Sequence, residues 1–507
     1  MDGSELLMGV DVGTASTKGV LARPDGEILG IAERPHELSL PRPGWAEHDA
    51  EGMWWKDFTE ICAELLERAD GGTVAAVCLS GIGPCFLAAD KDGRPLRPAI
   101  LYGIDTRASR EVGELTSRYG NADITRRCGN PLSAQSVGPK IVWLRRHEPD
   151  VFEKTRYFFM AHTFVAHRLT GAYVLDHSSA SMVEPLYDTT QNRWIEEWCQ
   201  DVAPGLEMPE LRWSTDIAGE ISRRGAEATG LPEGIPVAVG TTDSFADSFS
   251  VGVKNPGDAI IIYGSTMSII VIAEESLPAN NLWSNAHLFD GTYNLSSGMA
   301  TSGSLTDWLS KISDGRSFAD LTEEAANTPA GSDGLVVLPY FAGERTPLLD
   351  PDARGVMCGL TLGHTRGHLY RALLEATAFG ARHLLEVVNE TGGEGERVIA
   401  VGGGTKGGLW TQIVSDITGI TQKIPERTVG AGYGDAMLAG IACGLLDRDA
   451  RWTSMTDTVE PNPENRGVYD ELYRVYRDLY PATRPMAHAL AEFQMREDTD
   501  LGEAPTS

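Results

Sequence analysis

One stretch near the start of the chain, residues 7–21 (LMGVDVGTASTKGVL), restricts the fold more than any other segment. An apolar run ends at Asp11, and a turn of small polar residues leads through Thr17 and Lys18 into a second apolar run. The glycine in this turn, Gly13, allows the backbone to approach a ligand closely. Successive backbone N–H groups, with the Thr and Ser hydroxyls and Lys18, can then surround phosphate oxygens. An ordinary β-hairpin fits the same residues, so this stretch alone leaves both interpretations open.

The size and composition of the chain indicate a globular protein of more than one domain. Its 507 residues exceed what a single hydrophobic core organises, and 42% hydrophobic with 23% charged residues is typical of soluble proteins. No apolar run is long enough to span a membrane, and the N-terminus lacks the order of a signal peptide. We therefore expect a cytoplasmic protein with no membrane partner.

The cysteines also favour a cytoplasmic protein, and the net charge argues against nucleic acid as a partner. The seven cysteines are scattered and form no CxxC pair, which is typical of reduced thiols. The net charge of −29 argues against nucleic acid as a partner, because nucleic acid requires a basic surface. The same charge repels ATP at long range, so a nucleotide site has to supply N–H donors, lysine and Mg²⁺ locally.

Strands and helices alternate along the first half of the chain, which predicts an α/β domain. The first thirty residues predict strand, turn, strand, turn, strand, with the second turn at residues 23–26 (RPDG). Asp49 is a candidate N-cap for the next helix. The remaining predicted elements are a helix over 53–68, strands over 74–80 and 86–89, and helices over 107–119 and 138–147.

The opening pattern returns in the middle of the chain. Residues 235–239 are apolar and end at Asp243 in the sequence GTTD, and residues 258–263 (DAIIIY) run into Gly264-Ser265-Thr266 and a second apolar run over 268–273. Two similar domains, each with a phosphate-facing hairpin, explain this recurrence. Coincidence also explains it, because Gly-Ser-Thr turns are common.

A third glycine-rich segment covers residues 398–419 (VIAVGGGTKGGLWTQIVSDITG). An apolar strand stops at Gly402-Gly403-Gly404, and a helical period follows. Glycines between a strand and a helix N-terminus suit a nucleotide, because the free N–H groups of the helix favour anions or polar ligand edges. Tight packing of the strand on the helix is the alternative interpretation.

These three segments, in this order, resemble the FGGY family of carbohydrate kinases, and most closely its xylulokinase-like branch. The resemblance covers nearly the whole chain, and it extends to Pro43-Gly44-Trp45, Asp105-Thr106-Arg107, Leu169-Thr170-Gly171, residues 338–347 (LPYFAGERTP) and residues 354–375 (RGVMCGLTLGHTRGHLYRALLE). It implies an α/β fold of two actin-like (ribonuclease-H-like) ATPase domains around a central cleft. The N-terminal domain, residues 1–251, then holds the sugar-acceptor side, and residues 252–495 form the C-terminal domain. Residues 496–507 are polar and acidic, which predicts a disordered tail.

The resemblance also assigns the site and its cofactors, ATP and Mg²⁺. Asp243 corresponds to the catalytic base, although Asp247 lies only one helical turn further on. Asp11 corresponds to the residue that orients hydrated Mg²⁺, and Tyr102 and Asp105, with Asp243, are expected to face the acceptor. The positions expected to contact ATP are Gly13, Thr14, Ser16, Thr17, Lys18, Gly264, Ser265, Thr266, Gly303, Gly402, Gly403, Gly404 and Thr405.

The chain departs from the family pattern on the acceptor side. Xylulokinases usually have Gly-Gln-Met-His-Gly in the segment that corresponds to residues 80–90 (SGIGPCFLAAD), whereas this chain carries Ile82, Gly83 and Pro84 there, with no polar side chain. His162-Thr163 stands where many relatives have Lys-Asp. Buried polar groups make a sugar site selective. We therefore expect an ATP-dependent sugar kinase with D-xylulose as the first substrate to test. Another ketose, a polyol or an aldonate is the alternative acceptor.

Two other classes of protein share parts of this pattern. A nucleotide-binding pseudokinase that senses a sugar needs no base, and the presence of Asp11, Lys18 and Asp243 argues against it. An actin-like or chaperone-like ATPase lacks the GERTP and HTRGHLYRALLE segments found here. A small sugar or polyol is the expected partner, and a homodimer stays open.

Overall fold

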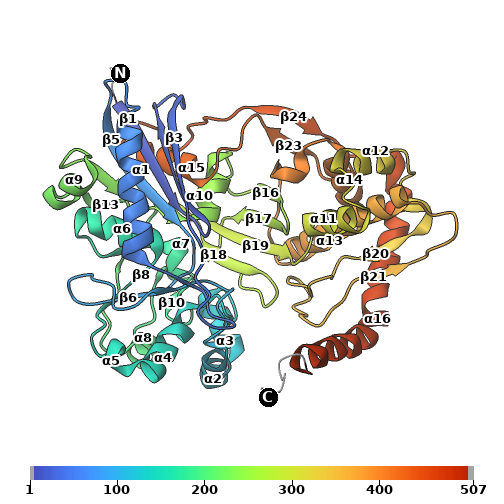
Figure 1. Ribbon diagram of the computed structural model, residues 1–507, viewed down its shortest axis with the longest axis horizontal. Coiled ribbons are helices and arrows are strands. Elements are labelled where there is room, and N and C mark those ends of the chain that lie inside the picture. The colour runs from blue at the N-terminus through green and yellow to red at the C-terminus, as the bar shows by residue number, and fades with distance from the viewer. Residues whose placement is uncertain (1–4, 501–507) are drawn as a thin grey trace, which may run out of the picture. The chain divides into compact units, whose positions relative to one another are not determined.

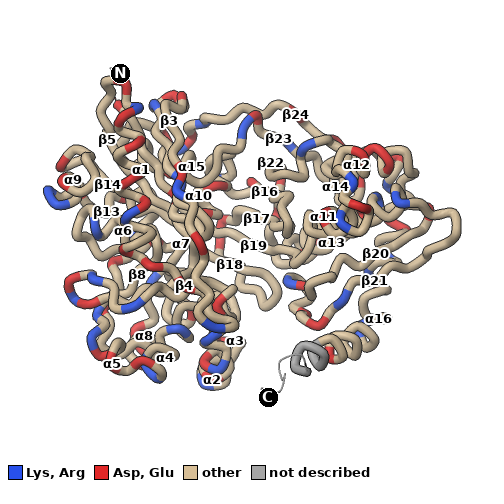
Figure 2. The backbone as a smooth tube through the Cα atoms, viewed as in Figure 1, with Lys and Arg blue, Asp and Glu red and all other residues tan. Residues whose placement is uncertain are grey.

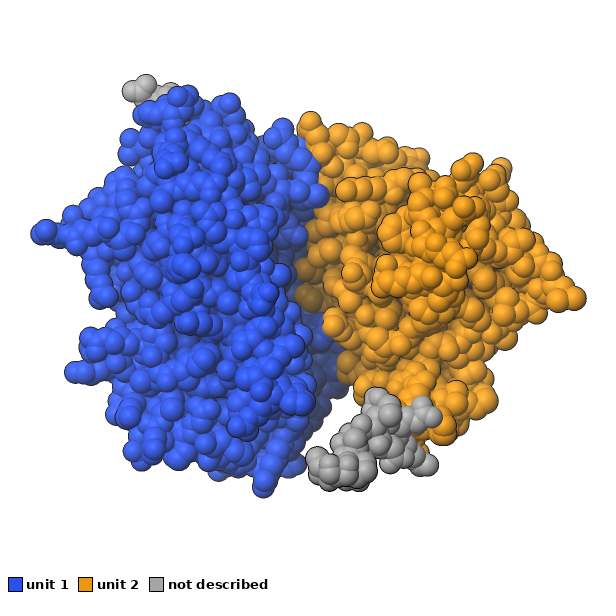
Figure 3. All heavy atoms as spheres, viewed as in Figure 1, with its two compact units in different colours: residues 1–256, 272–294, 427–454 blue, residues 257–271, 295–426, 455–507 orange. Residues whose placement is uncertain are grey.

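The computed structural model describes residues 5–500 and divides into two compact units (Figures 1 and 3). Unit 1 contains residues up to 256 together with 272–294 and 427–454, and unit 2 contains 257–271, 295–426 and the chain from 455 onward. The predicted domain boundary at 251/252 lies close to the first crossing between the units. A single boundary cannot describe this division, because unit 1 also contains residues 272–294 and 427–454. The second of these segments contributes a residue to the site described below.

The sheet of unit 1 has the strand order β13-β14-β5-β1-β2-β3. Strand β1 is antiparallel to β2 and parallel to β5, and β14 and β15 are also parallel to β5. The bounds of these strands are β1 Glu5–Val12, β2 Ser16–Ala22, β3 Ile28–Pro35, β5 Thr73–Gly81, β13 Ile217–Glu220, β14 Pro236–Ala238 and β15 Thr241–Thr242. The three strands predicted for the opening of the chain are thereby confirmed.

The two faces of β1 belong to two different hydrophobic clusters. Met8 and Val10 pack with Ile61 of helix α1, Lys56–Leu66, whereas Leu7 packs with Met437 of helix α15, Ala431–Ala442. This division follows from the two-residue period of a strand. Asp11 therefore lies on the α15 face of the sheet, together with every second residue of β1.

The remaining elements of unit 1 follow each other in chain order around this sheet. Asp49 accepts hydrogen bonds from the N–H groups of Glu51 and Gly52 at the start of the predicted helix, which confirms it as a cap. These elements are β4 Glu47–His48, η1 Ala50–Trp55, β6 Leu87–Ala89, β7 Ala99–Ile100, α2 Ser109–Tyr119, α3 Asn121–Cys128, α4 Val137–His147, α5 Pro149–Phe152, β8 Tyr157–Phe159, α6 Ala161–Thr170, β9 Val174–Asp176, α7 His177–Ala180, β10 Tyr187–Asp188, β11 Arg193–Trp194, α8 Glu196–Val202, β12 Glu210–Arg212, α9 Arg223–Thr229, α10 Asp243–Ser250 and β18 Trp283–Ala286.

Unit 2 repeats the strand pattern of unit 1. Its strands follow the order β19-β17-β16-β22-β23-β24, with β16 antiparallel to β17 and parallel to β22, and with β23 parallel to β22 and antiparallel to β24. This corresponds strand by strand to β3-β2-β1-β5-β14-β13. The prediction of two similar domains is confirmed at the level of topology. The bounds are β16 Asp258–Tyr263, β17 Met267–Ala273, β19 Tyr293–Met299, β22 Arg397–Val401, β23 Gln422–Pro425 and β24 Met455–Val459.

The helices of unit 2 include two long ones, α13 (Arg366–Glu390) and α16 (Arg466–Asp500). Residues 496–500, which the sequence predicted as part of a disordered tail, form the last turn of α16, and residues 501–507 lie outside the described residues. The other elements are α11 Gly303–Ile312, α12 Phe318–Ala326, η2 Ser332–Gly334, β20 Val336–Leu338, β21 Val356–Cys358, η3 Gly403–Thr405, α14 Leu409–Thr418 and η4 Pro463–Asn465.

Two general properties complete the description of the fold. Acidic residues occur along the elements of both units (Figure 2), in keeping with the net charge of −29. In the part of the chain that the structure describes, no helix combines the length and the apolar character needed to cross a membrane.

Candidate active site

Acidic side chains from separate segments of unit 1 meet on the α15 face of its sheet. Asp11 stands near the end of β1, Asp243 is the first residue of α10, and Asp435 lies in α15. Helix α10 packs on α15, and α15 packs on β1. Glycines allow this approach, since a Cβ atom at Gly9 of β1 would lie 2.1 Å from the carbonyl oxygen of Gly432.

Ser80, at the end of β5, connects two of these carboxylates. Its Oγ donates a hydrogen bond to Asp435 Oδ2 at 2.6 Å and lies 3.3 Å from Asp11 Oδ1. The other oxygen of Asp435, Oδ1, is buried and has no hydrogen-bond partner. A buried carboxylate with an unsatisfied oxygen is costly unless a proton or a cation neutralises it.

The electrostatics of the cluster follow from burial and from like charge. Burial, followed by the charge of Asp243, raises the pKa of Asp11 well above its usual range. Burial, opposed by the Ser80 hydrogen bond and reinforced by the charge of Asp11, raises the pKa of Asp435 in the same direction. Each carboxyl therefore holds its proton to a higher pH than an exposed aspartate does.

Asp243 is suited to accept a proton near neutral pH. Burial raises the pKa of Asp243 to about 6, against the hydrogen bond that its Oδ1 accepts from the Ser244 N–H at 2.7 Å. Burial raises the pKa of Asp247, one turn along α10, to about 6 as well. The N-cap of α10 is Thr242, so Asp243 is the first helical residue and not the N-cap. A carboxylate that titrates near 6 is ionised, and still basic, at pH 7.

The turn between β1 and β2 holds the predicted first phosphate motif, Gly13–Lys18. Lys18 pairs with Asp11 across the hairpin and lies on the same face of the sheet. Thr17 points to the opposite face, where its hydroxyl donates to Asp57 of α1 at 3.3 Å. The structure therefore brings Lys18 and Asp11 together but does not bring the Thr17 side chain to them.

The other residues of this turn make contacts inside unit 1. The Gly13 N–H donates to the Ser16 carbonyl at 3.0 Å, and the Ser16 hydroxyl donates to Glu33 at 2.8 Å. Lys18 Nζ lies 3.8 Å from the same glutamate. Thr14 is half-buried at the tip of the turn. These contacts fix the shape of the turn.

The segment that departs from the family pattern lies directly beside Asp243. Ile82 and Pro84 are buried, and a Cβ atom at Gly83 would lie 2.3 Å from the Thr242 side chain, next to Asp243. The wall that residues 82–84 form is therefore apolar, as their sequence predicted.

Asp105 and Tyr102, the two other predicted acceptor residues, belong to a different arrangement. Asp105 is buried, and its carboxylate accepts hydrogen bonds from the Arg107 guanidinium, at 2.6 Å to Nη2, and from the Ala46 N–H at 2.7 Å. The Arg107 guanidinium stacks on the Trp45 ring at 3.9 Å. Tyr102 is half-buried, and its carbonyl accepts from the Asp105 N–H. The Asp105-Thr106-Arg107 and Pro43-Gly44-Trp45 motifs thus pack together, and the acceptor role of Tyr102 and Asp105 stays a prediction.

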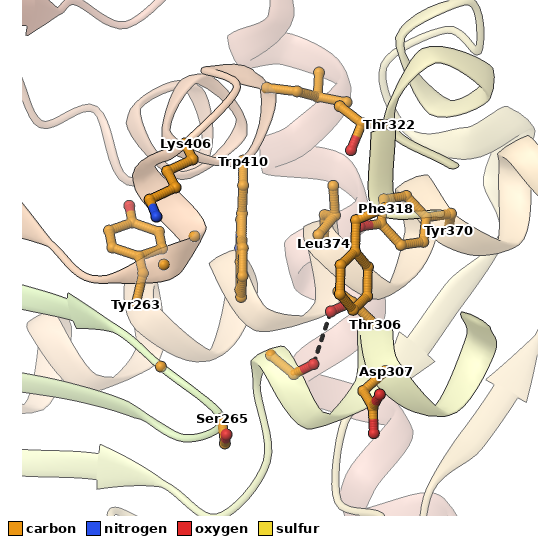
Figure 4. A pocket seen from close by; sticks show the side chains of 15 residues that line it. Tyr263, Ser265, Thr306, Asp307, Phe318, Thr322, Tyr370, Leu374, Lys406 and Trp410 are labelled. Atoms are coloured by element: carbon orange, nitrogen blue, oxygen red, sulfur yellow. Dashed lines mark hydrogen bonds between the residues drawn. The ribbon is translucent and has the colours of Figure 1, made fainter. Parts of the chain in front are cut away.

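Unit 2 contains a cavity of about 590 Å³, and its lining includes five of the predicted nucleotide residues, namely Gly264, Ser265, Gly303, Gly403 and Gly404 (Figure 4). Four aromatic rings contribute to its wall, and in Figure 4 Trp410 lies between Tyr263 on one side and Phe318 with Tyr370 on the other. The lining residues are Tyr263, Gly264, Ser265, Gly303, Thr306, Asp307, Phe318, Thr322, Tyr370, Leu374, Gly403, Gly404, Lys406, Leu409 and Trp410.

Close backbone packing defines one end of this cavity. The Gly303 N–H donates to the Gly264 carbonyl at 2.9 Å, and a Cβ atom at Gly303 would lie 2.5 Å from that oxygen. Gly402 has a φ of 102°, and a Cβ atom there would lie 2.5 Å from the Tyr263 carbonyl oxygen. The glycines at these two positions therefore allow the strand ends and the start of α11 to converge.

Polar groups without partners also lie at this end. The hydroxyls of Ser302 and Ser304, which flank Gly303, are buried and have no hydrogen-bond partner. Of the other predicted residues, Thr266 ends the turn and its carbonyl accepts from the Gly264 N–H, while the Thr405 hydroxyl donates to the Gly402 carbonyl at 2.8 Å. These two hydroxyls flank Gly303, which lines the cavity, although neither serine is itself a lining residue.

Sequence reasoning missed Asp435 and the aromatic residues of the cavity. Trp410 stood inside a predicted motif, but its ring was not singled out as part of a binding surface. Phe318 lies in a helix that no motif marked, and Tyr370 lies inside the motif of residues 354–375, where its ring was not singled out either. No local pattern distinguishes such residues from ordinary core positions.

Comparison with known proteins shows which family the chain belongs to. The model of the FGGY family of carbohydrate kinases, N-terminal domain, matches residues 6–250, and that of the C-terminal domain matches residues 259–443. A xylulose kinase of Bacillus subtilis (strain 168) is 27% identical over 503 residues, which cover 96% of this chain and 99% of that protein. A glycerol kinase of Nocardia farcinica (strain IFM 10152) is 32% identical over 472 residues, covering 88% and 93%.

A solved structure gives the same result for the fold. The crystal structure of xylulose kinase from Rhodospirillum rubrum superposes with a TM-score of 0.89 at 33% identity, covering 95% of this chain and 100% of that one. The fold is thus the mixed α/β, actin-like fold of the sugar kinases, and the predicted fold class is confirmed. The chain belongs to the FGGY family of carbohydrate kinases and is a sugar phosphotransferase.

Proposed function

We propose that the protein transfers the γ-phosphoryl group of ATP to a hydroxyl group of a sugar or polyol, with Asp243 as the general base and D-xylulose as the first substrate to test. The observation that carries this proposal is the position of Asp243 at the start of α10, next to Asp11 and with a pKa of about 6. Such a carboxylate can accept the hydroxyl proton as the phosphoryl group moves, which contributes about 10²–10⁴-fold to the rate.

The cavity of unit 2 is the proposed nucleoside site. Its aromatic walls are suited to the flat faces of a base, and the turn Gly264–Thr266 with Gly402–Thr405 offers backbone N–H groups to phosphates. Ser302 and Ser304 supply two hydroxyls that have no partner in the structure. In the first motif, the internal contacts of Ser16 and Thr17 favour the backbone and Lys18 as the phosphate contacts.

The acidic cluster fits a hydrated Mg²⁺ better than a directly coordinated metal. Across residues 5–500, no set of three or more His, Cys, Asp or Glu side chains is arranged to hold an ion. Mg²⁺ keeps several of its waters in phosphate sites, and Asp11 is the residue we propose to hold them. A bound ion supplies positive charge that neutralises the phosphates. Burial and the negative charge of Asp243 raise the pKa of Asp11 against the charge of Lys18, so a nearby cation would favour its ionised form.

The choice of acceptor is the finer part of the proposal. Residues 82–84 form an apolar wall beside Asp243, so their side chains cannot hydrogen-bond to sugar hydroxyls. Xylulose kinases and a glycerol kinase are both among the relatives of this chain. Another ketose, a polyol or an aldonate therefore stays the alternative acceptor, and the test has to cover all of these classes.

The experiment is a coupled ADP-release assay with Mg²⁺ across pentuloses, hexuloses, polyols and aldonates, run with the wild type and with Asp243→Asn. We expect acceptor-stimulated turnover in the wild type and a loss of at least a hundredfold in the variant, with ATP binding retained in calorimetry. Near-normal turnover of Asp243→Asn removes Asp243 from the mechanism. Binding of a sugar by the wild type with no ADP release supports the sensing pseudokinase instead.

A further inference from the structure

His36 is a side chain of unit 1 that the proposed mechanism does not use. It follows directly after β3, and its side chain is only 6% exposed. Its Nδ1 lies 2.9 Å from Asp57 Oδ2 of α1, and its Nε2 lies 3.1 Å from the carbonyl oxygen of Gly13. Both oxygens are acceptors, so the protonated ring donates to each of them. The ring therefore bridges helix α1 and the predicted first phosphate motif, Gly13–Lys18.

The backbone of His36 holds a second carbonyl of the same turn. Its N–H donates to the Ala15 carbonyl at 2.9 Å. The carbonyls of Gly13 and Ala15 therefore both point toward His36. In a trans peptide, the carbonyl and the N–H of the following residue point in opposite directions. The N–H groups of Thr14 and Ser16 are thus directed away from His36.

The His36 ring lies on the α1 side of the hairpin, opposite to Asp11 and Lys18. The Asp57 oxygen that contacts the ring also accepts a hydrogen bond from the Thr17 hydroxyl at 3.3 Å. Thr17 faces α1, whereas Lys18 and Asp11 lie on the other face of the sheet. N–H groups directed away from His36 therefore point toward the side of the turn that carries Lys18 and Asp11. This is the side on which the proposed mechanism needs donors to phosphate oxygens.

A second histidine, His48 of β4, packs against the His36 ring and fixes its orientation. The two rings meet edge-on with their centroids 5.1 Å apart, and His48 is fully buried. Its Nδ1 accepts a hydrogen bond from Trp54 Nε1 at 3.1 Å. Burial, followed by the charge of His36, lowers the pKa of His48 to about 4. His48 is therefore a neutral wall at pH 7, and the contacts that orient the His36 ring are those with Asp57 and Gly13.

We propose that His36 is a positioning residue for nucleotide binding: held by Asp57, it fixes the Gly13 carbonyl so that the N–H groups of the turn face the phosphates of ATP. This inference rests on the proposed role of the turn as the first phosphate motif. It adds a residue that lies outside every motif that carries the family resemblance. His36 acts through the backbone of the turn and does not itself contact the nucleotide.

Two amide substitutions separate the two contacts of the ring. In His36→Asn the amide nitrogen takes the place of Nδ1 and donates only to Asp57, whereas in His36→Gln it takes the place of Nε2 and donates to the Gly13 carbonyl. The measurement is the Kd of a non-hydrolysable ATP analogue with Mg²⁺, determined by calorimetry without any acceptor. We expect this Kd to rise about three- to tenfold in His36→Asn, the effect of one hydrogen bond. His36→Gln, which restores the donor to Gly13, should return it to within about twofold of the wild type.

A matched control and a second variant complete the design. His167→Gln is the control, because it removes a 3.0 Å contact between an imidazole nitrogen and a backbone carbonyl, that of Ala172, outside the turn. Its Kd should equal that of the wild type. His36→Ala covers the case in which His36→Asn folds poorly, since it leaves room for water at both oxygens, and it should weaken binding of the analogue to a similar extent. In turnover assays, KM for ATP should rise in His36→Asn and His36→Ala, while KM for the acceptor stays within about twofold.

The outcomes separate this inference from the proposed function, with Lys18→Met as the test of the turn itself. If Lys18→Met weakens binding of the analogue but His36→Asn and His36→Ala only lower the melting temperature, His36 only packs and the inference fails alone. A loss in His36→Gln as large as in His36→Asn also overturns it, because the Gly13 contact would then not be what binding requires. Unchanged affinity in Lys18→Met and in the His36 variants overturns the phosphate role of the turn as well. Weaker binding in Lys18→Met and His36→Asn, restored in His36→Gln, supports both.

Discussion

The hydroxyl of Ser80 donates a 2.6 Å hydrogen bond to Asp435, although 355 residues separate the two in the chain. Ser80 is the next-to-last residue of the central strand β5 of unit 1. Asp435 belongs to α15, in a segment of unit 1 that follows most of unit 2 in the chain. This late segment places a buried carboxylate within the acidic cluster of Asp11 and Asp243. The charge balance of the proposed catalytic site therefore depends on segments that lie far apart in the chain.

The pH dependence of turnover should report the carboxylates of α10. Because burial raises the pKa of Asp243 to about 6, and a base acts only when unprotonated, kcat should be constant above pH 7. It should fall to about a tenth of that plateau at pH 5. The two aspartates of α10 interact, so the limb belongs to the pair. The measurement is kcat from pH 4.5 to 9 at saturating ATP, Mg²⁺ and acceptor.

Asp247→Asn tests the assignment of that limb. The charge of Asp247 raises the pKa of Asp243, so removing this charge should move the acid limb to lower pH and leave the plateau within about threefold. A plateau that collapses as in Asp243→Asn would instead make Asp247 the base, which the sequence had offered as the competing position.

Gly303→Ala should weaken nucleotide binding without affecting the acceptor. The added methyl group would lie 2.5 Å from the Gly264 carbonyl oxygen, so either the start of α11 or the turn that follows β16 has to move. Overpacking of this kind costs about 1–3 kcal/mol, and we expect KM for ATP to rise about tenfold or more. Gly467→Ala is the control, because no atom lies within 4 Å of a Cβ atom at that position. A raised KM for the acceptor with an unchanged KM for ATP would contradict the proposed nucleotide site.

The fold was more predictable from the sequence than the candidate site was. The hairpins and the repeated topology were predictable because alternating and apolar runs are local signals, and β16 spans the predicted residues 258–263. The same period of two could have separated Thr17 from Lys18, since adjacent residues of a strand face opposite sides. The sequence therefore already indicated that Thr17 and Lys18 face opposite sides of the sheet, although both were predicted to contact ATP.

Asp435 and the cavity aromatics lay beyond sequence reasoning for a physical reason. Asp435 sits in an apolar helix among small residues, and only its contact with Ser80 reveals its place beside Asp11. Phe318, Tyr370 and Trp410 come from three helices that meet only in the folded unit. Such convergence is set by tertiary packing and leaves no periodic trace in the chain.

Arg107→Ala should destabilise the protein rather than weaken acceptor binding. The Arg107 side chain is fully buried between Asp105 and the Trp45 ring, and removing it leaves the Asp105 carboxylate without its positively charged partner. Breaking such a pair costs about 3–5 kcal/mol, which calorimetry should detect as a lower melting temperature. Arg110→Ala, which removes an exposed pair with Glu114, should leave the melting temperature nearly unchanged. An unchanged melting temperature with a raised KM for the acceptor would return Asp105 to the acceptor site.

Asp435→Asn should make the unliganded protein more stable at high pH. Burial, opposed by the Ser80 hydrogen bond and reinforced by the charge of Asp11, raises the pKa of Asp435 in the folded state above its unfolded value. The contribution of this group to stability is therefore complete below about pH 3.8 and is lost as the pH rises through the folded pKa. The amide is neutral at every pH and still accepts the Ser80 hydrogen bond, so it avoids the cost of a buried charge.

The melting temperatures of wild type and Asp435→Asn, measured without nucleotide or metal, should thus differ by a few degrees at pH 8–9 and converge toward pH 4. The variant should also bind Mg²⁺-ATP more weakly, because one negative charge is removed from the cluster that faces the cation. Lower stability of the variant at pH 9 would show that Asp435 is an ionised and well-partnered carboxylate. In that case the acidic cluster would be stabilised by its own contacts, and a cation would not be needed to balance it.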